Sequence, residues 1–280
     1  MENLGVLSAL GAALAWGSYF VPFKKSKSHK LILFQFVMTI GILISGIILS
    51  IMMGFPLSFN IFGVLTGVIW AIANTISLSA VLNLGISRAA PILASLVILS
   101  SFLWGTVVFN ELSTGMKAGF SGIGLIILGV VLVSSTGNAQ SQNVRKGLLA
   151  AIVAGLMFGS QFVPVKIGQI EARDFFFSMS LGIFLTGLVT FLIKRIKLEK
   201  EALKESLLSG IIWNIGNLLG VMAISLIGLA KGLPLTQVAV LVAVVWGLVY
   251  FREITQKKQK IQVMIGAIIL LLGVVILSSA

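Results

Sequence analysis

The chain has 280 residues, of which 58% are apolar and 10% charged, and its net charge is +12. Soluble domains carry about 25% charged residues, so this composition excludes an ordinary soluble fold and predicts a membrane protein. The chain has no cysteine and a single histidine, His29, which excludes a disulfide framework and a cysteine-based metal site. We expect no metal and no cofactor.

Ten apolar segments are predicted to cross the bilayer as helices. About 20 residues span the hydrocarbon core, and the uncharged stretch from Leu31 to Ser87 is long enough to cross twice. Gly54-Phe55-Pro56 is the place within it where the chain is expected to turn. The predicted helices are 3–23, 31–53, 61–83, 89–109, 116–135, 147–165, 175–193, 207–229, 233–251 and 260–279.

The basic residues predict the orientation of these helices. Sixteen of the 20 Lys and Arg residues follow the first, third, fifth, seventh and ninth helices, and positive loops stay in the cytoplasm. Both termini are then extracytoplasmic, in a multi-pass protein of the cell membrane. Glu2 precedes the first apolar run and four lysines follow it, so this run is expected to be an uncleaved span. Because the basic residues set topology, no nucleic-acid partner is expected.

Two halves of the chain resemble each other. Gly17-Ser18-Tyr19-Phe20-Val21-Pro22-Phe23-Lys24 recurs, with six of eight positions identical, as Gly159-Ser160-Gln161-Phe162-Val163-Pro164-Val165-Lys166. Apolar bias alone does not produce matched tryptophan, asparagine, proline and glutamate residues, so we infer an internal duplication. The other matches keep the same order and pair Trp70 with Trp213, Asn74 with Asn217, Arg88 with Lys231, Pro91 with Pro234, Trp104 with Trp246 and Glu111 with Glu253.

The repeat divides the protein into an N-terminal unit, 1–137, a linking loop, 138–146, and a C-terminal unit, 147–280. Each unit has five predicted helices, an odd number, so the second enters the membrane from the opposite side. Inverted repeats of this kind are typical of secondary transporters, with the substrate near the midplane. The fold class is therefore all-α, with ten transmembrane helices as two inverted five-helix repeats. The chain has no P-loop motif, so an ATP-driven pump is not expected.

The same residues carry a resemblance to a known family. Pro91 followed by Glu111-Leu112-Ser113-Thr114 and a glycine-rich span resembles the repeated pattern of the drug/metabolite transporter superfamily. The doubled Gly-Ser-x-Phe-Val-Pro-x-Lys motif more narrowly resembles the glucose/rhamnose porter branch. This resemblance implies transport of a sugar, often together with a proton.

Candidate substrate-binding residues are polar and aromatic side chains near mid-depth. Trp70, Asn74 and Ser77 are spaced so that they share one helix face. An amide offers two donors and an acceptor, and an indole gives a flat apolar wall with one N–H, which suits a hydroxyl-rich ligand. We predict substrate contacts from Trp16, Ser18, Tyr19, Trp70, Asn74, Ser160, Gln161, Trp213, Asn214 and Asn217.

Each of these residues also has a structural alternative. Asn74 and Asn217 could instead join helices by hydrogen bonds, and the Gly-Ser pairs could serve close helix packing. Lys24 and Lys166 are predicted gates at opposite faces, Lys24 with Glu253 and Lys166 with Glu111. The alternative for both lysines is simple anchoring at the membrane interface, and for both glutamates it is a structural ion pair or helix cap.

The leading functional hypothesis is a secondary-active or facilitative carrier of a small neutral sugar or polyol that works by alternating access. The alternative is an exporter or importer of another small metabolite or drug on the same fold. A proton relay normally uses intramembrane Asp, Glu or His, and none of the eight acidic residues lies within a span. Proton coupling thus rests on the resemblance alone. An enzyme is not expected, because no metal cluster, cysteine nucleophile or histidine base is present.

Overall fold

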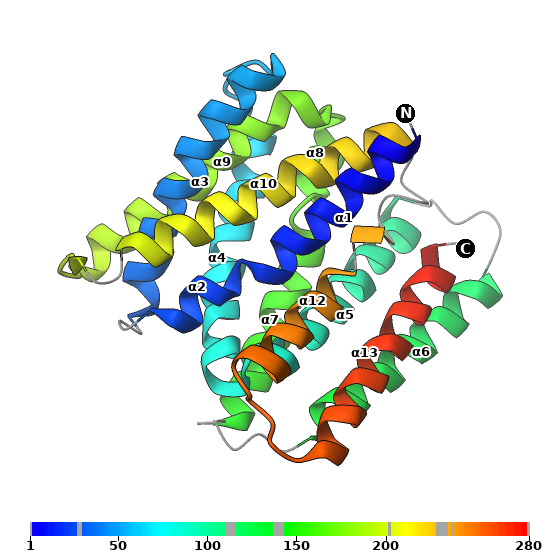
Figure 1. Ribbon diagram of the computed structural model, residues 1–280. Helices are drawn as coiled ribbons and strands as arrows, with labels where there is room; N and C mark the ends of the chain where they lie inside the picture. The colour runs from blue at the N-terminus through cyan, green and yellow to red at the C-terminus, as the bar shows by residue number, and fades with distance from the viewer. Residues whose placement is uncertain are drawn as a thin grey trace.

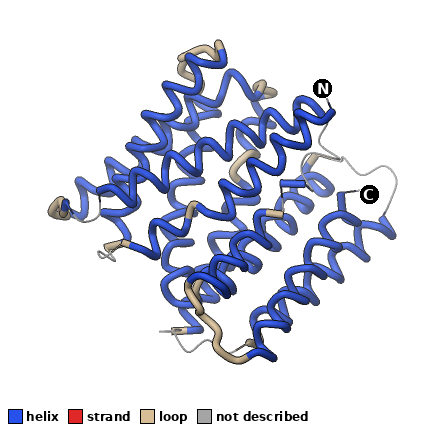
Figure 2. The backbone as a smooth tube through the Cα atoms, in the orientation of Figure 1, coloured by secondary structure: helices blue, strands red, loops and turns tan. Residues whose placement is uncertain are grey.

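The computed structural model describes residues 2–26, 30–109, 116–136, 143–200, 203–227, 235–236 and 238–278. Across these ranges the chain is helical and contains no strand (Figure 2). The helices are α1 (Glu2–Ser18), α2 (Phe20–Lys25), α3 (Leu31–Met53), α4 (Ile61–Leu84), α5 (Ile86–Leu103), η1 (Trp104–Val108), α6 (Met116–Ser134), α7 (Val144–Ser160), α8 (Val163–Gly168), α9 (Ala172–Lys194), α10 (Leu203–Ile227), α12 (Ala239–Val245), η3 (Trp246–Tyr250) and α13 (Lys257–Ser278).

Eight helical segments in the described ranges have the length and apolar composition needed to cross a membrane. They account for eight of the ten predicted spans. The remaining two predictions, 116–135 and 233–251, correspond to shorter apolar helices, Gly119–Val133 and Ala239–Tyr250. The all-helical class is therefore confirmed for the described residues, with eight segments that could span a membrane.

The first and sixth predicted helices are each broken, at matched positions. Residues 3–23 form α1 and α2 with a break at Tyr19, and 147–165 form α7 and the start of α8 with a turn at Gln161 and Phe162. Proline has no N–H and cannot bond to the carbonyl four residues earlier. Pro22 and Pro164 therefore release the carbonyls of Ser18 and Ser160, where α1 and α7 end.

The fourth and ninth predicted helices change geometry at matched tryptophans. Each passes into a short π-helix, η1 at Trp104 and η3 at Trp246. Such segments are rare and occur often at functional sites. The fourth helix also begins at Ile86, three residues earlier than predicted, because Glu253 binds the free N–H groups of its first turn.

The strongest helix contacts join the two halves of the chain. α1 packs on α10 and α12, α7 packs on α4 and α5, and α6 packs on α13 at one side of the bundle (Figure 1). Glycine permits the closest approaches: a Cβ on Gly17 would lie 2.7 Å from the Ala239 carbonyl oxygen, and one on Gly159 would lie 2.5 Å from that of Val97. The Gly-Ser motifs thus serve close packing, as the structural alternative proposed.

Candidate functional site

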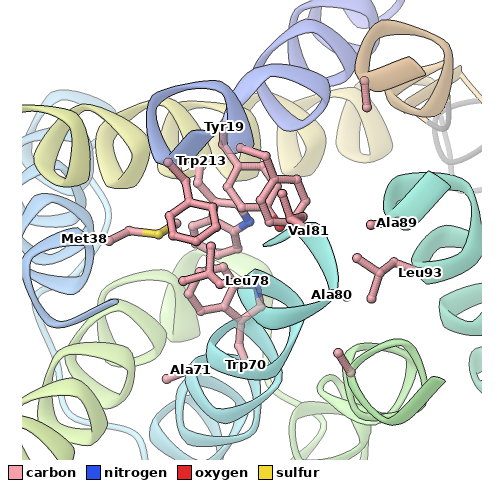
Figure 3. Close-up of a cluster of buried hydrophobic side chains, with 14 of the residues drawn as sticks. Tyr19, Met38, Trp70, Ala71, Leu78, Ala80, Val81, Ala89, Leu93 and Trp213 are labelled. Carbon is pink, nitrogen blue, oxygen red and sulfur yellow. The ribbon is translucent and has the colours of Figure 1, made fainter. Parts of the chain in front are cut away.

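A cavity of about 200 Å³ lies where α1, α2, α4, α5, α7, α10 and α12 meet. Six of the ten predicted substrate-binding residues line it. These six are Trp16, Tyr19, Trp70, Gln161, Trp213 and Asn217. The cavity adjoins the buried cluster in Figure 3, where Tyr19, Trp70 and Trp213 lie close together.

Aromatic rings form much of the cavity wall. The ring centroids of Trp70 and Trp213 are 4.1 Å apart with a tilt of 43°, and Phe158 lies 6.1 Å from Trp70. Matched tryptophans from the two halves therefore form one continuous apolar surface. Large aromatic side chains bury extensive apolar area and keep a defined geometry, so this wall is rigid enough to shape a ligand site.

Some residues that line the cavity were not predicted from the sequence. The matched pair Phe20 and Phe162 lies inside the repeated motif, and Phe158 matches Trp16 at the same offset of 142, so the repeat could have revealed all three. The small and aliphatic residues of α5 and α12 carry no polar signal and could not have been identified. They are Ala90, Leu93, Ala94, Val97, Ala239, Val240 and Ala243.

Buried polar atoms without a partner also belong to this cavity. Trp16 Nε1 and Gln161 Oε1 have no hydrogen bond to the described residues, although both atoms are buried, and both side chains line the cavity. An unpaired buried polar group costs roughly 1–3 kcal/mol.

Asn74, by contrast, lies outside the cavity lining and is fully buried. Its Nδ2 donates to Gln35 Oε1 at 2.7 Å and its Oδ1 accepts from the Tyr19 hydroxyl at 3.4 Å. Of the two asparagines predicted to line one cavity, Asn217 lies in the lining and Asn74 does not. The reason is local, because Gln35 on the neighbouring α3 supplies Asn74 with a partner.

Asn214 and the two motif serines also bond to protein groups instead of lining the cavity. Asn214 Nδ2 donates to the Ile42 carbonyl at 3.0 Å. Trp246 Nε1 donates to Ser18 Oγ at 2.9 Å, and Trp104 Nε1 donates to Ser160 Oγ at 2.8 Å. The serine contacts are reciprocal: each motif serine bonds to the tryptophan that begins the π-helix of the opposite half.

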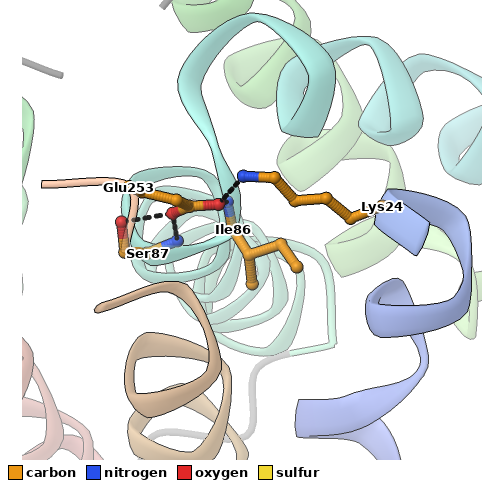
Figure 4. A network of polar contacts seen from close by, with 4 residues as sticks. All are labelled: Lys24, Ile86, Ser87 and Glu253. Carbon is orange, nitrogen blue, oxygen red and sulfur yellow. Dashed lines mark hydrogen bonds and ion pairs between the residues drawn. The ribbon is translucent and has the colours of Figure 1, made fainter. Parts of the chain in front are cut away.

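A second polar site joins Lys24 and Glu253 to the first turn of α5 (Figure 4). The Glu253 side chain is fully buried and forms an ion pair with Lys24. It also accepts hydrogen bonds from Ile86 N at 2.7 Å, Ser87 N at 2.8 Å and Ser87 Oγ at 2.6 Å. A carboxylate is favoured there because unpaired N–H groups and the helix dipole make a helix N-terminus positive. The cap role proposed as the alternative for Glu253 thus coexists with the ion pair to Lys24.

The matched lysine of the second half is Lys166. Lys166 is exposed, and its Nζ lies 5.1 Å from the centroid of the Phe109 ring. Its predicted partner Glu111 lies outside the described residues, as does Lys231. Arg88, the match of Lys231, is buried in the first turn of α5.

A comparison with protein families identifies the chain. A family model described as "Sugar transport protein" matches residues 7–280. The chain belongs to the sugar transport family.

Individual relatives in this sugar transport family extend over the same length. The glucose uptake protein GlcU of Bacillus subtilis (strain 168) is 28% identical over 290 aligned positions, which cover 99% of both chains. A protein of known crystal structure aligns with a TM-score of 0.62 at 15% identity, over 100% of this chain and 99% of that one, and at this identity the likeness concerns the fold alone. The family match and the apolar helices together indicate that this sugar transport protein is a multi-pass membrane transporter.

Proposed function

We propose that this protein is a carrier that moves a small neutral sugar across the cell membrane by alternating access, with the aromatic cavity as its substrate site. The observation that supports the proposal most is the lining of that cavity. It combines closely packed aromatic rings with two buried polar atoms, Trp16 Nε1 and Gln161 Oε1, that have no partner among the described residues. A sugar has hydroxyls to satisfy such atoms and C–H faces to lie against aromatic rings.

The charge of the lining favours a neutral substrate. None of the described residues that line the cavity is Asp, Glu, Lys, Arg or His. A charged ligand would lose its hydration there without gaining an opposite charge, which is strongly unfavourable. The volume of about 200 Å³ also lies below the roughly 300–1,000 Å³ typical of sites for drug-sized molecules, so a monosaccharide or polyol is the better fit.

The ion pair of Lys24 with Glu253 supports the alternating-access part of the proposal. It links α2 to the start of α5 and to the segment after η3. By the positive-inside rule, we propose that this end lies in the cytoplasm. We propose that the described conformation is closed on that side, and that opening separates Lys24 from Glu253.

The direct test is counterflow in proteoliposomes. Preloaded unlabelled glucose should accelerate entry of labelled glucose, because a carrier can reorient with bound substrate, whereas a channel has no such step. Nucleosides, amino acids and a cationic drug serve as matched substrates. If one of these is exchanged and no monosaccharide is, the sugar assignment is wrong and the alternative metabolite or drug carrier takes its place.

The same preparation tests proton coupling. No acidic side chain among the described residues lines the cavity, so the proposal places no proton site there. Uptake against a sugar gradient under an imposed pH gradient would demonstrate coupling. Equal uptake with and without the pH gradient would indicate facilitated transport.

Orientation is tested with introduced cysteines, since the chain has none of its own. Ser58 follows α3 and Gln256 precedes α13, and both are exposed. Extracytoplasmic termini place position 58 outside and position 256 inside. A membrane-impermeant reagent should then label Ser58→Cys and spare Gln256→Cys in intact cells, and the reverse pattern would invert the proposed orientation.

A further inference from the structure

The two halves contribute matched residues to the cavity region, yet these residues differ in hydrogen bonding. In the first half, the Asn74 amide has no free capacity. Its Nδ2 donates to Gln35 and to Met38 Sδ, and its Oδ1 accepts from the hydroxyls of Tyr19 and Ser77. The Tyr19 hydroxyl therefore uses its only hydrogen within the protein.

In the second half, the matched residues are Gln161 for Tyr19 and Asn217 for Asn74. Both line the cavity. Gln161 Oε1 is buried without a partner, and the Asn217 amide, only 5% exposed, forms no hydrogen bond with another described residue. The second half therefore presents amide groups whose hydrogen-bonding capacity the protein leaves open.

The cause of this asymmetry lies one helix away. α3 and α9 match at an offset of 141, through the identical pairs Phe34 and Phe175, Met38 and Met179, Gly41 and Gly182, and Ile42 and Ile183. In this register Gln35, the partner of Asn74, is matched by Phe176. A phenyl ring has no hydrogen-bonding group, so the second half lacks the residue that occupies Asn74 in the first.

We propose that the hydroxyl groups of the substrate are recognised by Gln161 and Asn217 of the second half, while the Tyr19–Asn74–Gln35 cluster of the first half is a preformed wall in which the Tyr19 hydroxyl and the Asn74 amide donate within the protein. The inference rests on the proposed sugar carrier and assigns its specificity. The hydroxyls of a sugar are arranged asymmetrically around its ring. A site with free hydrogen-bonding groups on one side only therefore binds the sugar in a single orientation. Amides suit this task because each offers both donors and an acceptor.

Deoxy analogues of the transported sugar test this assignment. Each analogue lacks one hydroxyl and competes with labelled glucose for the purified wild-type carrier. Loss of one hydroxyl–amide hydrogen bond should weaken competition roughly two- to tenfold. In Asn217→Ala or Gln161→Ala, removing the sugar hydroxyl that binds that amide should no longer weaken competition, because its hydrogen-bond partner is already absent. In Tyr19→Phe, the loss of each hydroxyl should weaken competition as much as it does in the wild type.

The controls keep each outcome decisive. Asn217→Ser and Gln161→Met replace any alanine variant that does not fold, as judged by thermal unfolding in detergent. If no monosaccharide competes in the folded wild type, the proposed sugar function fails. The assignment to the second half is overturned, while the sugar function stands, in either of two cases in which sugars compete. In the first, Tyr19→Phe abolishes the effect of removing one hydroxyl; in the second, neither amide variant abolishes such an effect.

Discussion

Lys24 and Lys166 end the same repeated motif, yet they have different surroundings. Lys24 is 20% exposed in its side chain and pairs with the buried Glu253, whereas Lys166 is exposed beside the Phe109 ring. Matched sequence therefore provides two equivalent positions without giving them equal burial. If the two lysines act as gates, their surroundings are expected to change in opposite directions, because closing one end is linked to opening the other.

The largest effect in this comparison is expected at Glu253. Glu253→Ala removes the acceptor for the Ile86 and Ser87 N–H groups and the partner of Lys24. Each buried donor left unpaired costs roughly 1–3 kcal/mol, so the variant should unfold at a clearly lower temperature in detergent. Glu253→Gln keeps an acceptor and should lose less. Wild-type stability in Glu253→Ala would show that the cap contributes little.

The next effect concerns the population of the two states. Lys24→Ala leaves Glu253 bonded to Ile86 and Ser87, so it should weaken closure at that end without unfolding the protein. A reporter cysteine at Ala94, which lines the cavity, should become more accessible from the cytoplasm in Lys24→Ala and from outside in Lys166→Ala. Lys25→Ala is the matched control. Identical shifts, or none, would leave both lysines as simple membrane anchors.

The two matched asparagines should separate binding from stability. Asn217→Ala is expected to raise KM several-fold with little change in unfolding temperature, because this amide bonds to no described protein group. Asn74→Ala should instead lower the unfolding temperature, because it leaves Gln35 and Tyr19 without their partner. Transport kinetics and thermal unfolding of both variants measure the contrast. The comparison breaks if the two variants show the same pattern.

The smallest effect is expected at the reciprocal serine contacts. Trp246→Phe and Trp104→Phe each remove one indole hydrogen bond to a motif serine, worth about 1 kcal/mol. Ser18→Ala and Ser160→Ala remove the same contacts from the other side. Double-mutant cycles on unfolding free energy should give similar coupling for both pairs. A large coupling for one pair alone would mean that the two contacts are not structurally equivalent.

Much of the site follows from residue type and repetition. The uncharged spans predict a lipid environment, because their apolar surface is unfavourable in water. Six polar or aromatic residues stand out within the apolar spans and belong to the cavity lining, namely Trp16, Tyr19, Trp70, Gln161, Trp213 and Asn217. The pairing of Lys24 with Glu253 followed from matched helix ends and an odd number of helices in each half.

The tertiary structure alone decided which matched residue is free to bind. Asn74 and Asn217 are the same residue in the same repeat position, and no local signal distinguishes them. Asn74 is bonded because α3 places Gln35 against it, whereas no described residue bonds to the Asn217 amide. Whether a buried amide faces a ligand or its own protein depends on the groups that neighbouring helices bring within hydrogen-bonding distance, and that distance exists only after the helices pack.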